Sequence, residues 1–178
     1  ISENHLERHG SLERYAGAKE RVLRLQSAED LTVINGDDPM VMSMARRSRA
    51  SRGVFGIASE SDLAKLSPTW ARISYDRDPL GVITLSRSGV VEEYPTEHVQ
   101  LLGRHNRYAM AASIVIARHL GVSQELVQEG IETFLPLPHR LEVIHNREGQ
   151  IVINDSKSTT VAATVAAVNT VLERFPSS

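Results

Sequence analysis

The segment that most constrains the fold of this chain is HNRYAMAASIVIARHLG, residues 105–121, which is apolar on nearly all sides. A helix with so little polar surface needs cover on most of its faces, so the pattern predicts a helix buried in a core. Gly121 at its end fits a C-terminal cap. Strand-like and helical segments alternate in the chain, and this alternation predicts an α/β fold.

Short elements are predicted before this helix. In order, they are a helix at 11–25 capped by Ser11, a strand at 31–34, a helix at about 39–47, a strand at 53–57 and strands at 71–75, 81–86 and 90–94. Alternating and β-branched residues mark the last three, and Ser88-Gly89 supplies a turn between the final pair. We therefore expect a small antiparallel excursion in the sheet.

A second group of elements follows the buried helix. A helix begins after its N-cap Ser123, and the prolines of FLPLPHR then break the helical pattern, which indicates a domain boundary. A hairpin is predicted over 140–155 with its turn near Glu148-Gly149, and a last helix over 159–175 ends before Pro176.

Composition limits the classes of partner. The formal net charge is -2 and no long basic run occurs, so a nucleic-acid or membrane-surface partner is not expected. No apolar stretch is long enough to cross a bilayer, and the first residues do not resemble a signal peptide. The chain has no cysteine, which is compatible with a reducing cytoplasm.

Lys19 is the first candidate for chemistry. The apolar or small residues of its predicted helix, Leu12, Tyr15, Ala16, Val22 and Leu23, form one stripe that also includes Lys19. One interpretation is a lysine whose stem packs while its amine stays in water. The other is an amine that faces a cleft and takes up carbon dioxide, since a carbamate offers oxygen ligands to a hard divalent cation.

Two histidines near the start of the chain are a second candidate. His5 and His9 are four residues apart, which on a helix places both rings on one face. A zinc-protease motif is excluded, because it requires Glu directly after the first histidine and Leu6 stands there. Two exposed histidines in a loop remain the alternative.

Polar residues at two predicted helix starts complete the candidates. Asn106 is either an N-cap or a side chain that presents its amide to a base or phosphate. Asn154, Asp155 and Lys157 follow a strand at 151–153 and precede a helix, where α/β proteins place ligands. They suit a phosphate and metal site, or only a solvated turn with an N-cap. The sequence contains no Walker A motif.

Four segments together resemble one family. In order, they are HLERHGSLERYAGAKERV, LLGRHNRYAMAA, FLPLPHRLE and INDSKSTT. They resemble the ATP-dependent Mur ligases of peptidoglycan synthesis, and NDSK is typical of the branch that adds D-glutamate. The resemblance runs from Ile1 to about Leu172.

The family's architecture gives an expected division of the chain. Residues 1–136 correspond to the second half of a P-loop-type central ATPase domain, with a parallel sheet and a small antiparallel excursion. Residues 137–178 correspond to the beginning of a Rossmann-like C-terminal domain. The chain is thus expected to be a piece of a longer enzyme, and to be inactive by itself.

The resemblance also implies a reaction. ATP phosphorylates the carboxylate of UDP-N-acetylmuramoyl-L-alanine, and the amine of D-glutamate then attacks the acyl phosphate to form an amide. The implied cofactors are ATP and Mg²⁺, and the implied enzyme is a cytoplasmic monomer.

Site residues are carried over from the matching motif positions. The implied catalytic residues are His5, Lys19 and Lys157, and the implied magnesium ligands are His5 and Lys19 as its carbamate. The implied nucleotide-binding residues are Asn106, His139, Arg140 and Asp155, while Lys157 and Thr159 are implied to approach the γ-phosphate and D-glutamate.

Some positions depart from the family pattern. They are Asn4 and Glu7 near the metal histidine, Ala109 in place of a second asparagine, Pro136 in place of a glycine and Thr160 in place of an asparagine. Ala109 removes one expected nucleotide contact. A non-catalytic Mur-like domain is therefore an alternative, whereas a folylpolyglutamate synthase fits NDSK and PHRLE poorly.

Overall fold

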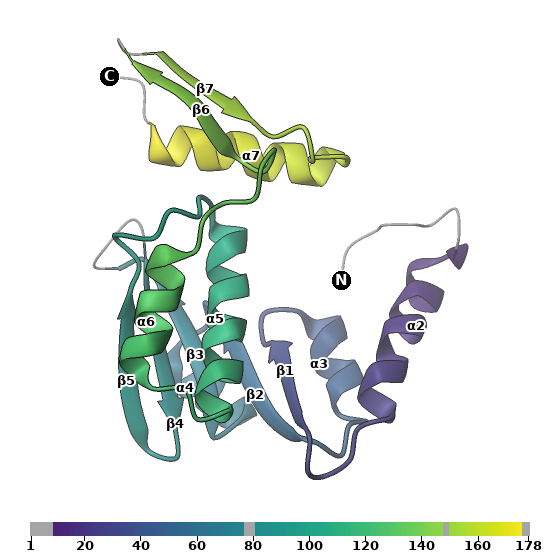
Figure 1. Cartoon of the computed structure of the whole chain (residues 1–178). Coiled ribbons are helices and arrows are strands. Elements are labelled where there is room, and N and C mark those ends of the chain that lie inside the picture. The colour runs from purple at the N-terminus through teal and green to yellow at the C-terminus, as the bar shows by residue number, and fades with distance from the viewer. Residues whose placement is uncertain (1–8, 77–80, 148–149, 176–178) are drawn as a thin grey trace.

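The computed structural model describes residues 9–76, 81–147 and 150–175. Figure 1 shows a sheet flanked by helices, with a separate hairpin and one helix beyond it. The elements are α2 (Leu12–Arg24), β1 (Leu31–Asn35), α3 (Pro39–Ala45), β2 (Ser51–Gly56), α4 (Glu60–Leu66), β3 (Thr69–Ser74), β4 (Val82–Arg87), β5 (Val90–Pro95), α5 (Arg104–His119), α6 (Gln124–Thr133), β6 (Glu142–Arg147), β7 (Gln150–Asn154) and α7 (Val161–Arg174).

The main sheet has the order β1-β2-β3-β4-β5. β1, β2 and β3 pair in parallel, whereas β4 pairs antiparallel with both β3 and β5. Among these described strands, only β4 runs against the others. The predicted α/β fold with a small antiparallel excursion is confirmed. β3 pairs with β2 on one side and with β4 on the other, so the antiparallel strands belong to the same sheet as the parallel ones.

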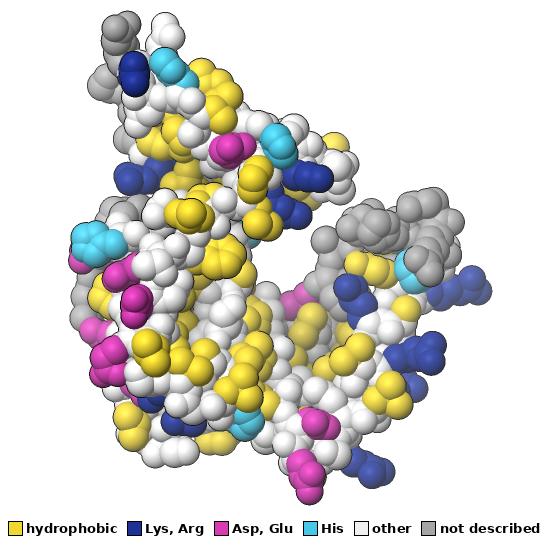
Figure 2. All heavy atoms as spheres, viewed as in Figure 1, with side chains coloured by type: hydrophobic (Ala, Val, Ile, Leu, Met, Phe, Trp, Pro, Cys, Tyr) yellow, Lys and Arg dark blue, Asp and Glu magenta, His cyan; other side chains and the backbone are white. Residues whose placement is uncertain are grey.

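α2 packs against α3 at the β1 side of the sheet, and it corrects one prediction. Its buried residues are Ala16 and Glu20, while Lys19 is exposed, with its Nζ 4.9 Å from the centre of the Tyr15 ring. Figure 2 shows Lys and Arg side chains on the outer surface of this helix. The prediction that Lys19 faces the buried side is wrong, because the helix packs through the row that contains Ala16 and Glu20.

Glu20 helps to hold α2 in place through charged hydrogen bonds. Its carboxylate is buried and accepts hydrogen bonds from Arg24 at 2.7 Å and from Arg47, just beyond α3, at 2.5 Å. Burial raises the pKa of Glu20, but the hydrogen bonds from Arg24 and Arg47 outweigh that effect and leave the pKa lowered. The ionised carboxylate therefore joins α2 to the end of α3.

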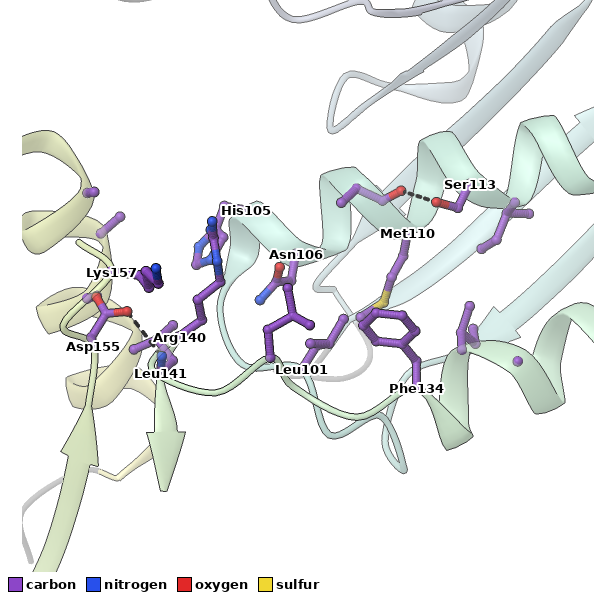
Figure 3. Close-up of a pocket in the computed structure, with 18 of the residues that line it drawn as sticks. Leu101, His105, Asn106, Met110, Ser113, Phe134, Arg140, Leu141, Asp155 and Lys157 are labelled. Atoms are coloured by element: carbon purple, nitrogen blue, oxygen red, sulfur yellow. Dashed lines mark hydrogen bonds between the residues drawn. The ribbon is translucent and has the colours of Figure 1, made fainter. Parts of the chain in front are cut away.

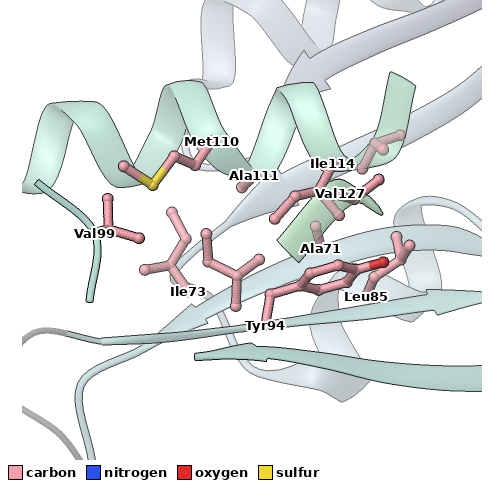
Figure 4. Packing of buried hydrophobic residues seen from close by; sticks show 11 residues of the cluster. Ala71, Ile73, Leu85, Tyr94, Val99, Met110, Ala111, Ile114 and Val127 are labelled. Carbon is pink, nitrogen blue, oxygen red and sulfur yellow. The ribbon is translucent and has the colours of Figure 1, made fainter. Parts of the chain in front are cut away.

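The main core lies between α5 and the sheet (Figure 4). The described core residues of this cluster are Ala71, Ile73, Ile83, Leu85, Tyr94, Val99, Met110, Ala111, Ile114, Val115 and Val127. At the closest approach, a Cβ on Gly53 would lie 2.6 Å from the Val115 side chain, so only glycine fits there. The predicted buried helix is confirmed on this side, but its other side is open: Ala109, Ser113 and Ile116 are exposed.

A smaller cluster on the other face of the sheet includes a helix that the sequence analysis missed. This helix is α4, whose Leu63 is fully buried beside Val54 and Trp70. Ser59 caps it by accepting a hydrogen bond from the Asp62 amide, which is a recognisable N-terminal signal. With only seven residues, α4 is too short to show a helical hydrophobic period.

The remaining chain forms a hairpin and a helix. β6 and β7 pair antiparallel as predicted, although the turn at Glu148-Gly149 lies outside the described residues. Thr160 caps α7 by accepting from the Ala163 amide, and α7 ends at Arg174. Among the residues with a described position, no helix has the length and apolar character needed to cross a membrane.

The C-terminal end of α5 is held to β5 by a charged pair. Arg118 donates to the Glu92 carboxylate at 2.5 and 2.8 Å, and the Tyr94 hydroxyl donates to the same carboxylate at 2.6 Å. Both charged side chains are largely buried. These hydrogen bonds, Arg118 first among them, hold the pKa of Glu92 below its ordinary value although burial opposes them.

We expect Glu92→Gln to destabilise the chain by about 1–2 kcal/mol at pH 7, because it removes a charge-assisted bond. A lowered pKa stabilises the fold above the unfolded-state pKa of about 4.3, and this contribution is lost as pH falls through the folded value. The difference between the variant and its parent should therefore shrink from pH 6 towards pH 3 in urea denaturation. The exposed Glu29→Gln is the control, and a difference that stays constant with pH would contradict the prediction.

Candidate functional site

A cavity of about 920 Å³ lies between α5, α6, the segment that follows α6, and α7 (Figure 3). Much of its wall is apolar, with Met110, Ile114 and Phe134 among the contributing residues. The charged side chains in the wall are Arg140, Asp155 and Lys157, which come from the two ends of the hairpin. The cavity thus combines an apolar interior with a small group of charges at one end.

The first turn of α5 supplies the cavity wall next to these charges. Gly103 is the N-cap, and its φ of 91° is unfavourable for other residues. Asn106 is the third residue of the helix, and its side-chain amide donates to the Leu102 carbonyl at 2.6 Å. Asn106 is therefore not the N-cap, although its side chain lines the cavity.

The charged end of the cavity is built by two turns that are tied together. Asp155 accepts a hydrogen bond from the Leu141 amide at 3.1 Å, and the Lys157 amide donates to the His139 carbonyl at 3.2 Å. Both His139 and Leu141 have positive φ, 66° and 47°. Arg140 lies between these two residues, so this unusual backbone sets the direction in which its side chain leaves the turn.

His105 is next to the charged group. Burial lowers the pKa of its imidazole more than nearby Asp155 raises it, and Arg140 lowers the pKa further. The ring is then neutral at neutral pH, where it can stack or accept a hydrogen bond. The charged groups in the wall are then two cations, Arg140 and Lys157, and one carboxylate, Asp155. The excess of positive charge favours an anionic ligand.

The cavity brings together four of the residues implied by the family resemblance. Asn106, Arg140, Asp155 and Lys157 all line it, although they come from three separate sequence motifs. His139 is beside it, and its Nδ1 pairs with the Asn154 side-chain amide at 2.8 Å.

The other predicted residues lie elsewhere. Thr159 is exposed and is not in the wall, while its neighbour Thr160 is. Lys19 is on α2, and His5 lies outside the described residues.

The described segments contain no cluster of three or more His, Asp or Glu side chains arranged to hold a metal ion, and the implied ligand His5 lies outside them. Lys19 is a cation in its unmodified form, so it becomes a ligand only as a carbamate. No step is therefore assigned to a metal from this geometry.

Part of the cavity wall was not predicted from the sequence. Ser113 and Ala117 follow His105 and Ala109 at intervals of four along the same side of α5. Small residues at helical spacing indicate a face with room beside it. This signal was present, but the apolar character of the whole segment obscured it.

The fold and the cavity together define an α/β protein with a largely apolar cavity that has two cations and one carboxylate at one end. Residues 1–117 match the Mur ligase middle domain. The chain therefore belongs to the Mur ligase family.

Curated relatives agree with this membership. The chain is 34% identical to the UDP-N-acetylmuramoylalanine--D-glutamate ligase of Anaeromyxobacter dehalogenans, over 92% of this chain and 35% of that protein. The protein of the same name in Geobacter sp. strain M21 is also 34% identical, over 99% of this chain and 36% of the relative. The chain thus spans about a third of the length of these relatives.

Solved structures share the fold. A crystal structure of MurF from Acinetobacter baumannii matches with a TM-score of 0.74 and 19% identity, over 97% of this chain and 36% of that one. UDP-N-acetylmuramate-alanine ligase MurC from Thermotoga maritima matches with a TM-score of 0.65 and 23% identity, over 98% of this chain and 37% of that one. At these identities, the likeness concerns the fold alone.

Gly103 offers a test of how the cavity is closed. A Cβ on Gly103 would lie 2.7 Å from the Thr170 hydroxyl of α7 and 2.8 Å from the His105 ring, whereas a Cβ on Gly121 would meet nothing within 4 Å. Both glycines have positive φ. We expect Gly121→Ala to cost about 1 kcal/mol from backbone strain and Gly103→Ala at least about 2 kcal/mol, because it adds crowding.

Denaturation in urea and hydrogen exchange of the α7 amides check this prediction. Gly103→Ala should speed exchange in α7, because the helix must shift to admit the methyl group. Equal stability losses in the two variants, with unchanged exchange in α7, would show that the contact between Gly103 and α7 is unimportant.

Proposed function

We propose that this chain works in an ATP-dependent ligase that adds D-glutamate to UDP-N-acetylmuramoyl-L-alanine, as the names of its relatives describe. The observation that carries the proposal is the cavity, which collects Asn106, Arg140, Asp155 and Lys157 beside an apolar wall. A nucleotide has both parts that such a site needs, an aromatic base and a chain of anionic phosphates.

Roles follow from position in the wall. Arg140 and Lys157 supply the cations that attract phosphate oxygens, while Asn106 and the neutral His105 supply polar groups for the base. Asp155 holds the Leu141 amide and so keeps Arg140 in its place. We further propose that His139 lies near the base and that Lys157 and Thr159 approach the γ-phosphate and D-glutamate when the complete enzyme binds its substrates.

The domain division is part of the same proposal. Residues 1–136 would belong to the central ATPase domain and residues 137–178 to the C-terminal domain. Separate pairing of β6 with β7, apart from the five-stranded sheet, supports a boundary in the proline-containing segment before β6. The nucleotide would then lie between two domains, which is a common place for ligand sites.

The chemistry proposed for the complete enzyme is phosphoryl transfer followed by amide formation. The γ-phosphoryl group of ATP passes to the substrate carboxylate, and the amine of D-glutamate then displaces phosphate from the acyl phosphate. Mg²⁺ would neutralise phosphate charge, with His5 and carbamylated Lys19 as its proposed ligands. The exposed position of the Lys19 amine leaves it accessible to carbon dioxide. We place this enzyme in the cytoplasm as a monomer.

A second candidate function is a Mur-like domain that binds nucleotide without catalysis. Ala109 favours it, because this residue lines the cavity but offers no hydrogen bond to a base. Ligase activity of a complete protein that contains this chain would exclude this alternative.

The nucleotide proposal predicts that the 178-residue chain binds ATP through Arg140. Arg140→Ala should weaken binding about tenfold, because it removes a charge-assisted contact to phosphate. Arg49→Ala, an exposed arginine that is not in the cavity wall, is the matched control. Titration of a fluorescent ATP analogue measures the affinity, and phosphate release should stay at the level of a Lys157→Ala control. Equal affinities for the two arginine variants would refute the site.

The carbamate proposal predicts a chemical rescue in the complete enzyme. Lys19→Ala should abolish ligation, because the metal loses an anionic oxygen ligand, and formate or acetate should restore part of the rate. The measurement is phosphate release with and without the added carboxylate, with sodium chloride at equal ionic strength as control. Failure of every small carboxylate to restore activity would count against the carbamate.

A further inference from the structure

In the first two turns of α5, one face of the helix lines the cavity and another does not. His105, Asn106 and Ala109 line the cavity, whereas Arg104 and Tyr108, four residues apart, do not. Residues four apart share a face of a helix, so Arg104 and Tyr108 form one face directed away from the cavity. This face also carries Ala111 and Val115, which pack in the main core. Together with that packing, the contacts of Arg104 and Tyr108 set the rotation of α5 about its axis, and that rotation decides where Asn106 points.

Tyr108 makes the most directional of these contacts. Its hydroxyl donates a hydrogen bond to Oδ2 of Asp37 at 2.8 Å, and its ring meets Phe55 of β2 edge-on, with the centres 6.2 Å apart. Burial, and then the bond to Asp37, strongly raise the pKa of Tyr108. The hydroxyl therefore keeps its proton and remains the donor.

Asp37 is itself held rigidly at the carboxyl end of the parallel strands. It follows β1, and its carboxylate accepts from the amides of Ile57 at 2.8 Å and Ala58 at 3.3 Å, just after β2. A Cβ on Gly56 would lie 2.7 Å from this carboxylate, so glycine makes room for it. One carboxylate thus joins the ends of β1 and β2 to α5.

Arg104 makes a second, looser contact on the same face. Its guanidinium lies 4.9 Å from the centre of the Tyr75 ring, just after β3, and it pairs with the exposed Glu173 of α7 at 3.2 Å. A cation–π contact and an exposed ion pair keep most of their energy when the side chains shift slightly. They therefore restrain the rotation of α5 less than a hydrogen bond to a fixed carboxylate does.

We propose that Tyr108 is a positioning residue for the nucleotide site: by bonding to Asp37 it fixes the rotation of α5 and so places His105 and Asn106 in the cavity wall (Figure 3). The ligand in this statement rests on the proposed function, while the placement of Asn106 does not. Tyr108 touches no ligand itself, since it is not part of the wall.

The experiment compares two variants of the 178-residue chain that lose the same chemical group. Tyr108→Phe removes the hydroxyl bonded to Asp37, and Tyr94→Phe removes a hydroxyl bonded to Glu92 near the other end of α5. Both lose one bond from a tyrosine to a carboxylate, so both should lower stability to a similar extent. A purely structural role would cost both variants stability but would leave the affinity for a ligand unchanged.

The first readout needs no ligand: the NMR signals of the Asn106 side-chain amide, which donates to the Leu102 carbonyl. Tyr108→Phe should move these signals and Tyr94→Phe should leave them in place. Asp37→Asn keeps an oxygen that can accept from Tyr108, so it should move them less than Tyr108→Phe does. Unmoved signals in Tyr108→Phe, or equal shifts in Tyr94→Phe, would overturn the proposal.

The second readout is the affinity for the fluorescent ATP analogue. Tyr108→Phe should weaken binding about three- to tenfold while Tyr94→Phe leaves it unchanged, since small displacements of a binding group are costly. If the parent chain binds no analogue, the proposed nucleotide site in this chain fails, and the amide signals still decide the role of Tyr108. Equal affinity in both variants would overturn the proposal.

Discussion

Close contact between α5 and the sheet is the constraint on which the rest of the structure depends. Gly53 of β2 has no side chain, so Val115 of α5 packs directly against the strand, and a methyl group there would lie 2.6 Å from it. Burial of the α5 face with Ile114 and Ala111 supplies the main core. Because that face is committed to the sheet, the cavity lies along the side of α5 that carries His105, Ala109 and Ser113, and Ile114 borders both the core and the cavity.

The cavity needs backbone geometry that apolar packing does not supply. Arg140 leaves the chain between two residues with positive φ, and hydrogen bonds from Leu141 to Asp155 and from Lys157 to His139 hold that turn. The charges therefore sit on a rigid turn that faces the first turn of α5. The proposed ligand, a nucleotide, suits this arrangement because it joins anionic phosphates to an aromatic base.

Much of the fold could be predicted from local signals. Hydroxyl caps at Ser11, Ser123 and Thr160 act within a few residues of chain, and alternating apolar residues marked the strands. Asp155 and Lys157 were found for the same reason, since they follow a strand end. The candidate site was predicted in part: its charged end came from motifs, whereas its apolar wall depends on how α5, α6 and α7 lie around the cavity.

The sequence by itself determined the order of the described helices and strands except α4, because caps, periods and turn residues are local interactions. Only the tertiary structure decided which faces are buried: on α2 it buries Glu20 with Arg47 and leaves Lys19 exposed. It also decided that Tyr108 meets Asp37, 71 residues away. The spacing of apolar residues along the chain shows how apolar one face of a helix is. Which element covers that face is decided only when the helix packs in the folded protein.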